Sequence, residues 1–291
     1  MCDAIVMDSK KLAAKLNEQA KTAVLGFRRR PGLAIIKVGH DPASDIYVRN
    51  KMADCNKIGI NAKIHFIEAD DEDLSDEILL DTIKRLNLDD DVDGIIVQLP
   101  LPAGLNTRKI LDAIDPSKDV DCLGAINTGR MAIGREAMLP CTPAGIMALM
   151  DECLPGLMPG KNAVILGRSD IVGKPLARLM LQRDMTVTVC HSKTDPDYMH
   201  GLVKNADIVV SAMGNRTVLA DVSPHYIGTW GKVFIDVAMN RDAVGRLCGD
   251  IPSSWTRHCL AYTPVPGGVG PMTRAMLMQN VLKAAIVHGK K

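Results

Sequence analysis

Two kinds of segment alternate along most of the chain. Short apolar runs such as Leu33–Val38 and Gly94–Leu99 are typical of parallel strands that helices cover on both faces. Between them lie stretches with helical spacing of apolar residues, which we expect to form helices at Ser9–Arg29, Pro42–Ile58 and Leu74–Leu88. This alternation predicts an α/β protein.

The same pattern begins again after a turn-rich segment around Pro159. Further helices and strands are expected from about Thr142 and at Asn162–Gly167, Ile171–Gln182, Thr186–Cys190, Ile208–Ser211, Lys232–Val237 and Pro271–His288. We therefore expect two α/β lobes with a cleft between them. Residues 1–141 form one domain, on which the last helix (about 271–291) packs, and residues 142–270 form the other.

The composition excludes some classes of partner. The 291 residues include 35 Lys+Arg and 34 Asp+Glu, a net charge of +1, and only 3% are aromatic. A nucleic-acid-binding protein usually has excess positive charge for phosphates and aromatic side chains for bases, so this partner is not expected. The length allows an enzyme with a substantial core.

Cysteine usage and hydropathy indicate a compartment. The eight cysteines are scattered with no C-x-x-C pair, which favours reduced thiols over a disulfide framework. Neither the cysteines nor the seven histidines have the spacing of a zinc site. The N-terminal residues do not resemble a secretory signal, and no apolar run approaches the roughly 20 residues that span a bilayer. We expect a cytoplasmic protein without a membrane segment or a metal.

A candidate nucleotide-binding turn lies at Asn162–Pro175. An apolar strand ends at Gly167, and a helix begins a few residues later, near Gly173. Glycines let the backbone approach a ligand, and free amides at a helix N-terminus favour an anion. The G-x-G-x-x-G fingerprint is absent, so the segment is either a variant dinucleotide loop or a plain strand-to-helix turn.

The end of the following strand bears on the type of cofactor. NAD enzymes place an acid about 20 residues after the glycine loop, but this chain has His191 there, followed by Ser192, Lys193 and Thr194. Arg168 stands beside the first glycine. Hydroxyl and cationic groups suit a ribose 2′-phosphate and favour NADP, although a solvated polar loop would have a similar composition.

A second candidate site is the helix that begins near Asp41. Asp41 is a good N-cap and Pro42 suits the first turn, so Tyr47 and Lys51 fall on one face at i and i+4. A tyrosine ring can stack on a flat ligand, and a lysine can act as an acid or base when burial lowers its pKa. A surface Tyr–Lys pair is the alternative. Short-chain dehydrogenases also use Y-x-x-x-K, but there it follows the dinucleotide loop.

Three further segments carry candidate chemistry. Gln98 ends a buried strand, where substrates of open α/β sheets collect, or else it satisfies loop amides. The carboxylates in Lys118-Asp-Val-Asp121 are compatible with metal ligation or glycosidase chemistry, but capping a helix is the commoner use of an Asp. The glycine-rich stretch Thr263–Thr273 suits a ligand lid or a turn.

Taken together and in order, these motifs resemble the methylenetetrahydrofolate dehydrogenase/cyclohydrolase family over nearly the whole chain. The motifs are Tyr47-x-x-x-Lys51, Val97-Gln-Leu-Pro-Leu-Pro102, Lys118-Asp-Val-Asp121, Pro140-Cys-Thr-Pro143, Gly167-Arg-Ser-x-x-Val-Gly-x-Pro175 and Thr263–Thr273. Each is weak alone, but six in order are specific. The length is similar to that of the compact bacterial bifunctional form.

The resemblance implies a Rossmann-like NADP-binding domain after an N-terminal folate-binding domain, and a homodimer. It also implies two reactions in one-carbon metabolism. Oxidation of 5,10-methylenetetrahydrofolate by NADP gives the 5,10-methenyl cation, and hydrolysis then gives 10-formyltetrahydrofolate. No metal is required for either.

The resemblance also implies residue roles. Lys51 is the acid/base residue, and Gln98 positions it. Tyr47 stacks along the folate, and Asp121 accepts hydrogen bonds from the amino edge of the pterin. Further folate contacts fall on Leu99, Pro100, Pro266 and Gly270, and NADP contacts fall on Gly167, Arg168, Ser169, Val172, Gly173, His191, Ser192 and Met239.

Two departures from the family pattern lie near these sites. Asp121 is followed by Cys122-Leu123-Gly124 where the family has Gly-Phe-His, and Asp236-Val-Ala-Met-Asn240 replaces Asp-Val-Gly-Ile-Asn. The chain is therefore expected to be the bifunctional enzyme. The alternatives are a dehydrogenase with weak cyclohydrolase activity and a non-catalytic nucleotide-binding protein of the same fold.

Overall fold

The computed structural model describes residues 3–69, 74–135 and 138–289. The chain divides into two compact units. Unit 1 comprises Met1–Ala13 and Thr142–Thr273, and unit 2 comprises Ala14–Cys141 and Arg274–Lys291. Two helices, α1 (Ser9–Val24) and α11 (Gly270–Val287), contain a division point within their length.

Unit 2 contains a parallel three-stranded sheet in the order β3 (Asn61–Ile67), β2 (Gly32–Val38), β4 (Gly94–Val97). All seven residues of β2 are buried, as expected for a central strand with two covered faces. The helices that lie wholly within this unit are α2 (Pro42–Ile58), α3 (Asp76–Leu88), α4 (Thr107–Asp112) and α5 (Ala125–Ala132), and most of α1 and α11 also belongs to it.

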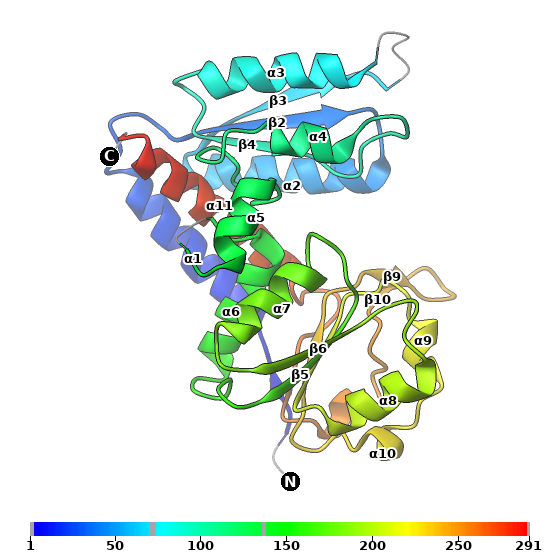
Figure 1. The fold of residues 1–291 in the computed structure, drawn as a ribbon. Helices are drawn as coiled ribbons and strands as arrows, with labels where there is room; N and C mark the ends of the chain where they lie inside the picture. Colours follow the sequence, from blue (N-terminus) through cyan, green and yellow to red (C-terminus); the bar gives the residue numbers. More distant parts are fainter. Residues whose placement is uncertain (1–2, 70–73, 136–137, 290–291) are drawn as a thin grey trace. The chain divides into compact units, whose positions relative to one another are not determined.

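The two faces of this sheet are packed by different helices, which Figure 1 shows most clearly for α2 and α3. Ile35 belongs to a core cluster with residues of α2 and α11, such as Cys55 and Met278. The next residue, Ile36, belongs to a second cluster with residues of α3 and α4, such as Ile83. Alternate side chains of one strand thus enter two separate cores.

Unit 1 contains a parallel six-stranded sheet. Its order is β1 (Ile5–Val6), β11 (Ala261–Tyr262), β8 (Val233–Asp236), β7 (Ile208–Ser211), β5 (Asn162–Leu166), β6 (Thr186–Cys190). The chain passes from β5 to β6 on one side and returns to β7 on the other. The carboxyl end of β5 is therefore a topological switch point, where open α/β sheets bind ligands.

The remaining elements of unit 1 surround this sheet. They are α6 (Cys141–Cys153), which begins at the division point, α7 (Gly173–Leu181), α8 (Pro196–Asn205), α9 (Thr217–Ala220), α10 (Pro224–Ile227), a 3₁₀ turn (Thr256–His258), and the antiparallel pair β9 (Asn240–Arg241) and β10 (Leu247–Cys248). One face has its own core, in which Phe234 packs against the fully buried Trp255 with ring centroids 5.6 Å apart.

The α/β class predicted from the pattern is confirmed, with differences at particular elements. The helix expected to end at Arg29 ends at Val24. The sequence predicts that residues 1–13 belong to the N-terminal domain, whereas β1 pairs in parallel with β11 and extends the sheet of unit 1. Two residues of strand are too short for a periodicity argument, so this pairing had no signal in the sequence.

In the segment Lys118-Asp-Val-Asp121, Lys118 and Asp119 form hydrogen bonds with backbone groups at the ends of two helices. The buried Lys118 Nζ donates to Leu86 O at 3.0 Å and to Asp89 O at 2.8 Å, both at the end of α3. The Asp119 carboxylate accepts from the backbone N–H of Gly124 at 3.0 Å, at the start of α5. Helix capping, rather than metal ligation, is what Asp119 does here.

We expect Lys118→Met to lower the free energy of unfolding by about 1–3 kcal/mol, because the buried carbonyl of Leu86 and the partly buried carbonyl of Asp89 lose their donor. Urea unfolding followed by circular dichroism measures this change. The control is Lys84→Met, at an exposed position of α3, which should change the free energy of unfolding by less than about 0.5 kcal/mol. Equal urea midpoints for the two variants would contradict the capping role.

Candidate functional site

Helix α2 begins and ends as its sequence predicts. The Asp41 carboxylate accepts from the backbone N–H of Ser44 at 2.8 Å, and Gly59 ends the helix in the left-handed conformation at φ 96°. These caps fix which residues face the same way, so Tyr47 and Lys51 lie one turn apart on one side of α2.

Lys51 meets the polar residue that follows β4. Its Nζ lies 3.1 Å from Gln98 Oε1 and donates to it, while Gln98 Nε2 donates to Leu99 O at 2.8 Å. Both amide atoms of Gln98 are thus engaged, which fixes its carbonyl oxygen toward the lysine. The Leu99–Pro100 peptide bond that follows is cis.

Asp121 lies beside the same group of side chains. The Cys141 Sγ donates to Asp121 Oδ1 at 3.5 Å. Burial raises the pKa of the Cys141 thiol well above its usual value; the Asp121 carboxylate adds to this effect and the Lys51 ammonium opposes it. Because both charges act on one thiol, the structure brings Lys51, Gln98 and Asp121 together within unit 2.

Tyr47 is half-exposed, with 37% of its surface accessible. Burial raises the pKa of its phenol, and the nearby Arg274 guanidinium lowers it. Arg274 is itself fixed by Asp54 on α2, with Arg274 Nε 2.7 Å from Asp54 Oδ2. An accessible ring on the lysine face of α2 has the exposure that stacking on a planar ligand needs.

Sequence reasoning missed the groups that support the Asp121 loop. Asn280 Nδ2, from α11, donates to Val120 O at 2.8 Å and to Leu139 O at 2.9 Å. Cys122 takes φ 57°, a conformation that favours glycine, and its buried thiol donates to Met138 O at 2.8 Å. The cysteine therefore keeps the backbone conformation that a glycine would allow, and its side chain points into the core.

After β5 in unit 1, the backbone at Gly167 passes very close to Ala212 and to Gly173. Gly167 has φ 125°, and a Cβ added there would lie 2.6 Å from Ala212 O. A Cβ on Gly173 would lie 2.1 Å from Gly167 O. Only glycines fit at both positions, and Ser169 Oγ accepts from the backbone N–H groups of Val172 and Gly173 at 3.2 and 3.4 Å. This cradle at the switch point fits the phosphates of a dinucleotide.

The turn after β6 exposes the polar residues predicted to select the cofactor. The backbone N–H of His191 donates to Thr194 Oγ1 at 3.0 Å, and that of Lys193 donates to His191 Nδ1 at 3.2 Å. Ser192, Lys193 and Arg168 are exposed, as groups that meet a 2′-phosphate must be. The residues present therefore fit NADP.

Three other predicted residues lie elsewhere in unit 1. Met239 is 54% exposed, between β8 and β9. Pro266 follows a cis peptide bond, and Gly270 begins α11. The Ser9 hydroxyl donates to Gly267 O at 2.5 Å, which ties this glycine-rich loop to the start of α1.

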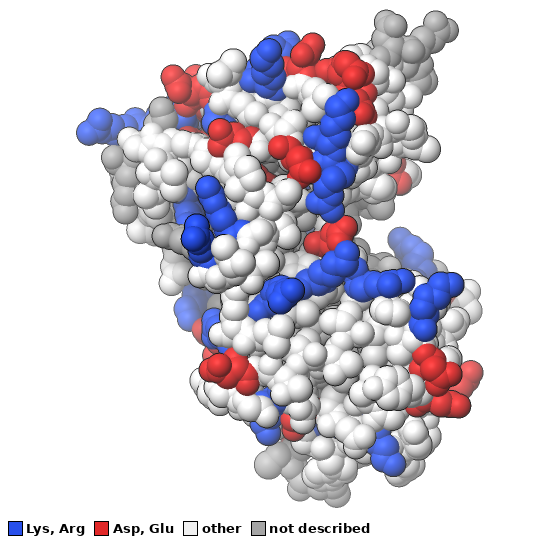
Figure 2. Space-filling model, viewed as in Figure 1, with Lys and Arg blue, Asp and Glu red and all other residues white. Residues whose placement is uncertain are grey.

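Electrostatic features of the described residues are modest. Figure 2 shows acidic and basic side chains on the face in view of each unit. Within the described ranges, no three His, Cys, Asp or Glu side chains are grouped as a metal site requires. The same part of the chain contains no helix that is long and apolar enough to cross a membrane.

The six-stranded sheet with a glycine cradle at its switch point defines a Rossmann-type nucleotide-binding unit, joined to a second α/β unit that carries the lysine site. Two family models match: the tetrahydrofolate dehydrogenase/cyclohydrolase catalytic domain over residues 7–121, and the NAD(P)-binding domain of the same family over residues 140–288. The chain belongs to the tetrahydrofolate dehydrogenase/cyclohydrolase family.

Individual members of the family are similar to this chain over nearly its full length. The bifunctional protein FolD of Acetivibrio thermocellus is 45% identical, with 99% of each chain covered. The structure of the bifunctional FolD of Campylobacter jejuni is 38% identical with a TM-score of 0.91, covering 98% of this chain and 99% of that chain. A Trypanosoma brucei FolD structure, complexed with NADP and inhibitor, is 34% identical with a TM-score of 0.91 and complete coverage of both chains.

Proposed function

We propose that this protein oxidises 5,10-methylenetetrahydrofolate with NADP and hydrolyses the 5,10-methenyl product to 10-formyltetrahydrofolate. The observation that carries the proposal is the hydrogen bond of Lys51 to Gln98 beside Asp121. A scaffold that only binds nucleotide has no need of a lysine held by a glutamine in its other unit. In this account, unit 2 binds the folate and unit 1 binds NADP.

The folate is recognised at its flat ring and at its polar edge. Tyr47 stacks along the substrate, and the Asp121 carboxylate accepts hydrogen bonds from the amino group of the pterin. Leu99, Pro100, Pro266 and Gly270 supply further contacts. The thiol of Cys141 and the amide of Asn280 hold the Asp121 loop in position for this role.

NADP is held by Gly167, Arg168, Ser169, Val172, Gly173, His191, Ser192 and Met239. NADP bound there would supply the acceptor for the hydride that the methylene carbon loses. The task of the protein in this step is to bind both molecules with the reacting carbons in contact.

Lys51 acts in the hydrolytic step. Addition of water to the cationic methenyl carbon releases one proton, and opening of the ring places one proton on the departing ring nitrogen. The Lys51 amine takes up the first proton and supplies the second. The hydroxyl group formed from the water loses its remaining proton as the C–N bond breaks and the formyl C=O forms, so the reaction releases one proton in total. Gln98 Oε1 orients the amine through their hydrogen bond.

The two alternative functions differ from this proposal in their products. Formation of NADPH from NADP and methylenetetrahydrofolate, followed by absorbance, supports the dehydrogenase. A dehydrogenase with weak cyclohydrolase activity would accumulate the methenyl compound. We favour the bifunctional enzyme because Cys122 keeps a backbone conformation that glycine would also adopt. If neither NADP nor NAD is reduced when methylenetetrahydrofolate is supplied, the proposed dehydrogenase activity is contradicted.

The preference for NADP gives a separate prediction. We expect Arg168→Ala to raise the KM for NADP about tenfold or more and to leave the KM for NAD unchanged, because only NADP carries the 2′-phosphate. Steady-state kinetics with each cofactor measures both values. The control is Arg178→Ala, an exposed arginine of α7. An unchanged preference in Arg168→Ala would remove this residue from the phosphate site.

We propose in addition that the protein is a cytoplasmic homodimer. The described cysteines are all free thiols, which a reducing compartment favours. The dimer rests on the family resemblance. Light scattering after size exclusion should give twice the 31.4 kDa mass of one chain, and a mass of 31.4 kDa would contradict the dimer.

A further inference from the structure

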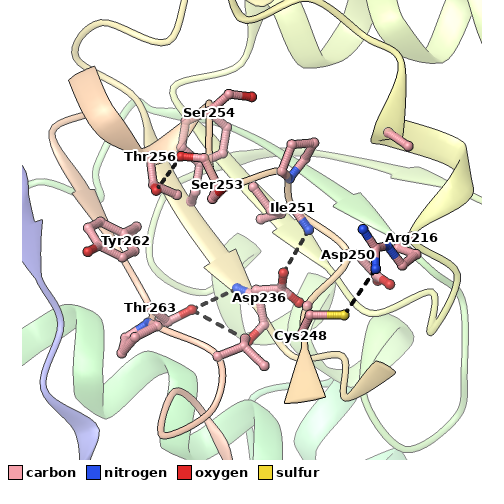
Figure 3. A pocket seen from close by; sticks show the side chains of 16 residues that line it. Arg216, Asp236, Cys248, Asp250, Ile251, Ser253, Ser254, Thr256, Tyr262 and Thr263 are labelled. Carbon is pink, nitrogen blue, oxygen red and sulfur yellow. Dashed lines mark hydrogen bonds between the residues drawn. The ribbon is translucent and has the colours of Figure 1, made fainter. Parts of the chain in front are cut away.

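Unit 1 contains a cavity of about 490 Å³ whose wall includes two carboxylates, Asp236 and Asp250 (Figure 3). Asp236 is 4% exposed and Asp250 is 2% exposed. Burying a carboxylate is costly unless hydrogen bonds replace its water. The hydrogen-bond donors to these two carboxylates therefore identify the segments that the carboxylates hold in place.

Asp250 connects the segments that follow β7 and β8. Its Oδ2 accepts from Ser211 Oγ at 2.8 Å and from the backbone N–H groups of Met213 at 3.1 Å and Gly214 at 3.2 Å. Its other oxygen, Oδ1, accepts from Asn240 Nδ2 at 2.8 Å. With four donors, this carboxylate is well compensated for its burial.

Asp236 connects the end of β8 to the segment after β10. Its Oδ1 accepts from the backbone N–H of Ala238 at 3.1 Å, and its Oδ2 accepts from that of Ile251 at 2.8 Å. The backbone N–H of Asp236 donates to Thr263 Oγ1 at 2.8 Å, a bond drawn in Figure 3. A Cβ on Gly249 would lie 2.0 Å from Asp236 Oδ2, so this approach requires glycine.

The two carboxylates thus fix both neighbours of Met239. Ala238 is bound to Asp236, and Asn240 is bound to Asp250. These segments follow β7 and β8, on the side of the β5 switch point opposite the β6 turn that is proposed to meet the ribose 2′-phosphate. They therefore face the nicotinamide half of a dinucleotide bound across the switch point. The side chain of Met239 is exposed, while the backbone N–H of Ala238 on one side of it and the side-chain amide of Asn240 on the other are held by hydrogen bonds.

We propose that Asp250, Asp236 and Asn240 are positioning residues that hold the Met239 loop against the nicotinamide end of NADP. They act through Met239 and do not touch the reacting atoms. The inference rests on the proposed function, in that NADP binds to unit 1. None of the three belongs to the residues through which the family resemblance assigns NADP contacts.

The test is Asn240→Ala, which removes only the hydrogen bond to Asp250 Oδ1. Two ligands are titrated: NADPH, by its own fluorescence, and 2′,5′-ADP, which lacks the nicotinamide, by calorimetry. We expect the Kd for NADPH to rise about tenfold, since each 1.4 kcal/mol is tenfold. The Kd for 2′,5′-ADP and the hydrolysis of methenyltetrahydrofolate should not change, because neither uses the nicotinamide.

The matched control is Asn205→Ala, in which Nδ2 loses a bond to Gly201 O of 3.0 Å within α8. It should bind both ligands as the unaltered protein does. An unchanged Kd for NADPH in Asn240→Ala would overturn the inference, and so would equal weakening of both ligands. If the unaltered protein binds neither ligand, the proposed function fails instead.

Discussion

Replacing Lys51 by methionine should abolish the hydrolysis of methenyltetrahydrofolate, with a loss on the order of 10²–10⁴-fold in kcat. Methionine has a similar length but no proton to exchange, so the water that attacks the cation and the nitrogen that leaves it lose their acid/base partner. Gln98 Oε1 also loses the donor that lies 3.1 Å away. The loss of methenyl absorbance measures the rate.

The control for this substitution is on the same helix. Lys57→Met removes a lysine from an exposed position in the last turn of α2 and should hydrolyse the substrate at the unaltered rate. Both variants should bind NADPH normally, because α2 belongs to unit 2. Retained hydrolysis in Lys51→Met would remove this lysine from the chemistry.

The second large effect is expected at the glycine cradle of unit 1. In Gly173→Ala, the new Cβ would lie 2.1 Å from Gly167 O and 3.0 Å from Arg168 Cα, so the segments after β5 must separate. We expect a cost of about 1–3 kcal/mol or more in stability. The Kd for NADPH should rise at least about tenfold, because the cradle amides move.

Gly201→Ala is the matched change in a helix of the same unit. Apart from its chain neighbours and the nearby backbone of α8, no atom of the described residues lies within 4 Å of a Cβ added to Gly201. Alanine is a better helix former, so this variant should gain about 0.5–1 kcal/mol in stability and bind NADPH normally. Urea unfolding and NADPH fluorescence test both variants. A Gly173→Ala protein with unaltered NADPH affinity would contradict the cradle.

The sequence predicted those elements well whose ends or burial depend on nearby residues, such as helix caps and continuous apolar runs. The Asp41 cap and Pro42 predict where α2 starts, and the structure has the expected bounds, Pro42–Ile58. The continuous apolar run of β2 likewise predicted a strand with both faces buried. The family motifs name Lys51, Gln98 and Asp121, and the structure brings these three together.

What the sequence did not predict depends on contacts between distant segments. The pairing of β1 with β11 joins Ile5 to Ala261, and Asn280 reaches Val120 across 160 positions. Most of the hydrogen bonds of Asp236 and Asp250 likewise join residues that are far apart in the sequence. The Gly249–Asp250 pair after β10 is a sign of them that the sequence analysis did not use, because Gly249 permits the close approach to Asp236.

The central claim is that one chain carries out both reactions in succession. The most direct measurement supplies the unaltered protein with methylenetetrahydrofolate and NADP and quantifies NADPH and 10-formyltetrahydrofolate in the same reaction. The account predicts that both products form, in equal molar amounts once the methenyl compound has been consumed. NADPH accompanied by methenyltetrahydrofolate that disappears no faster than it does without the protein would contradict it.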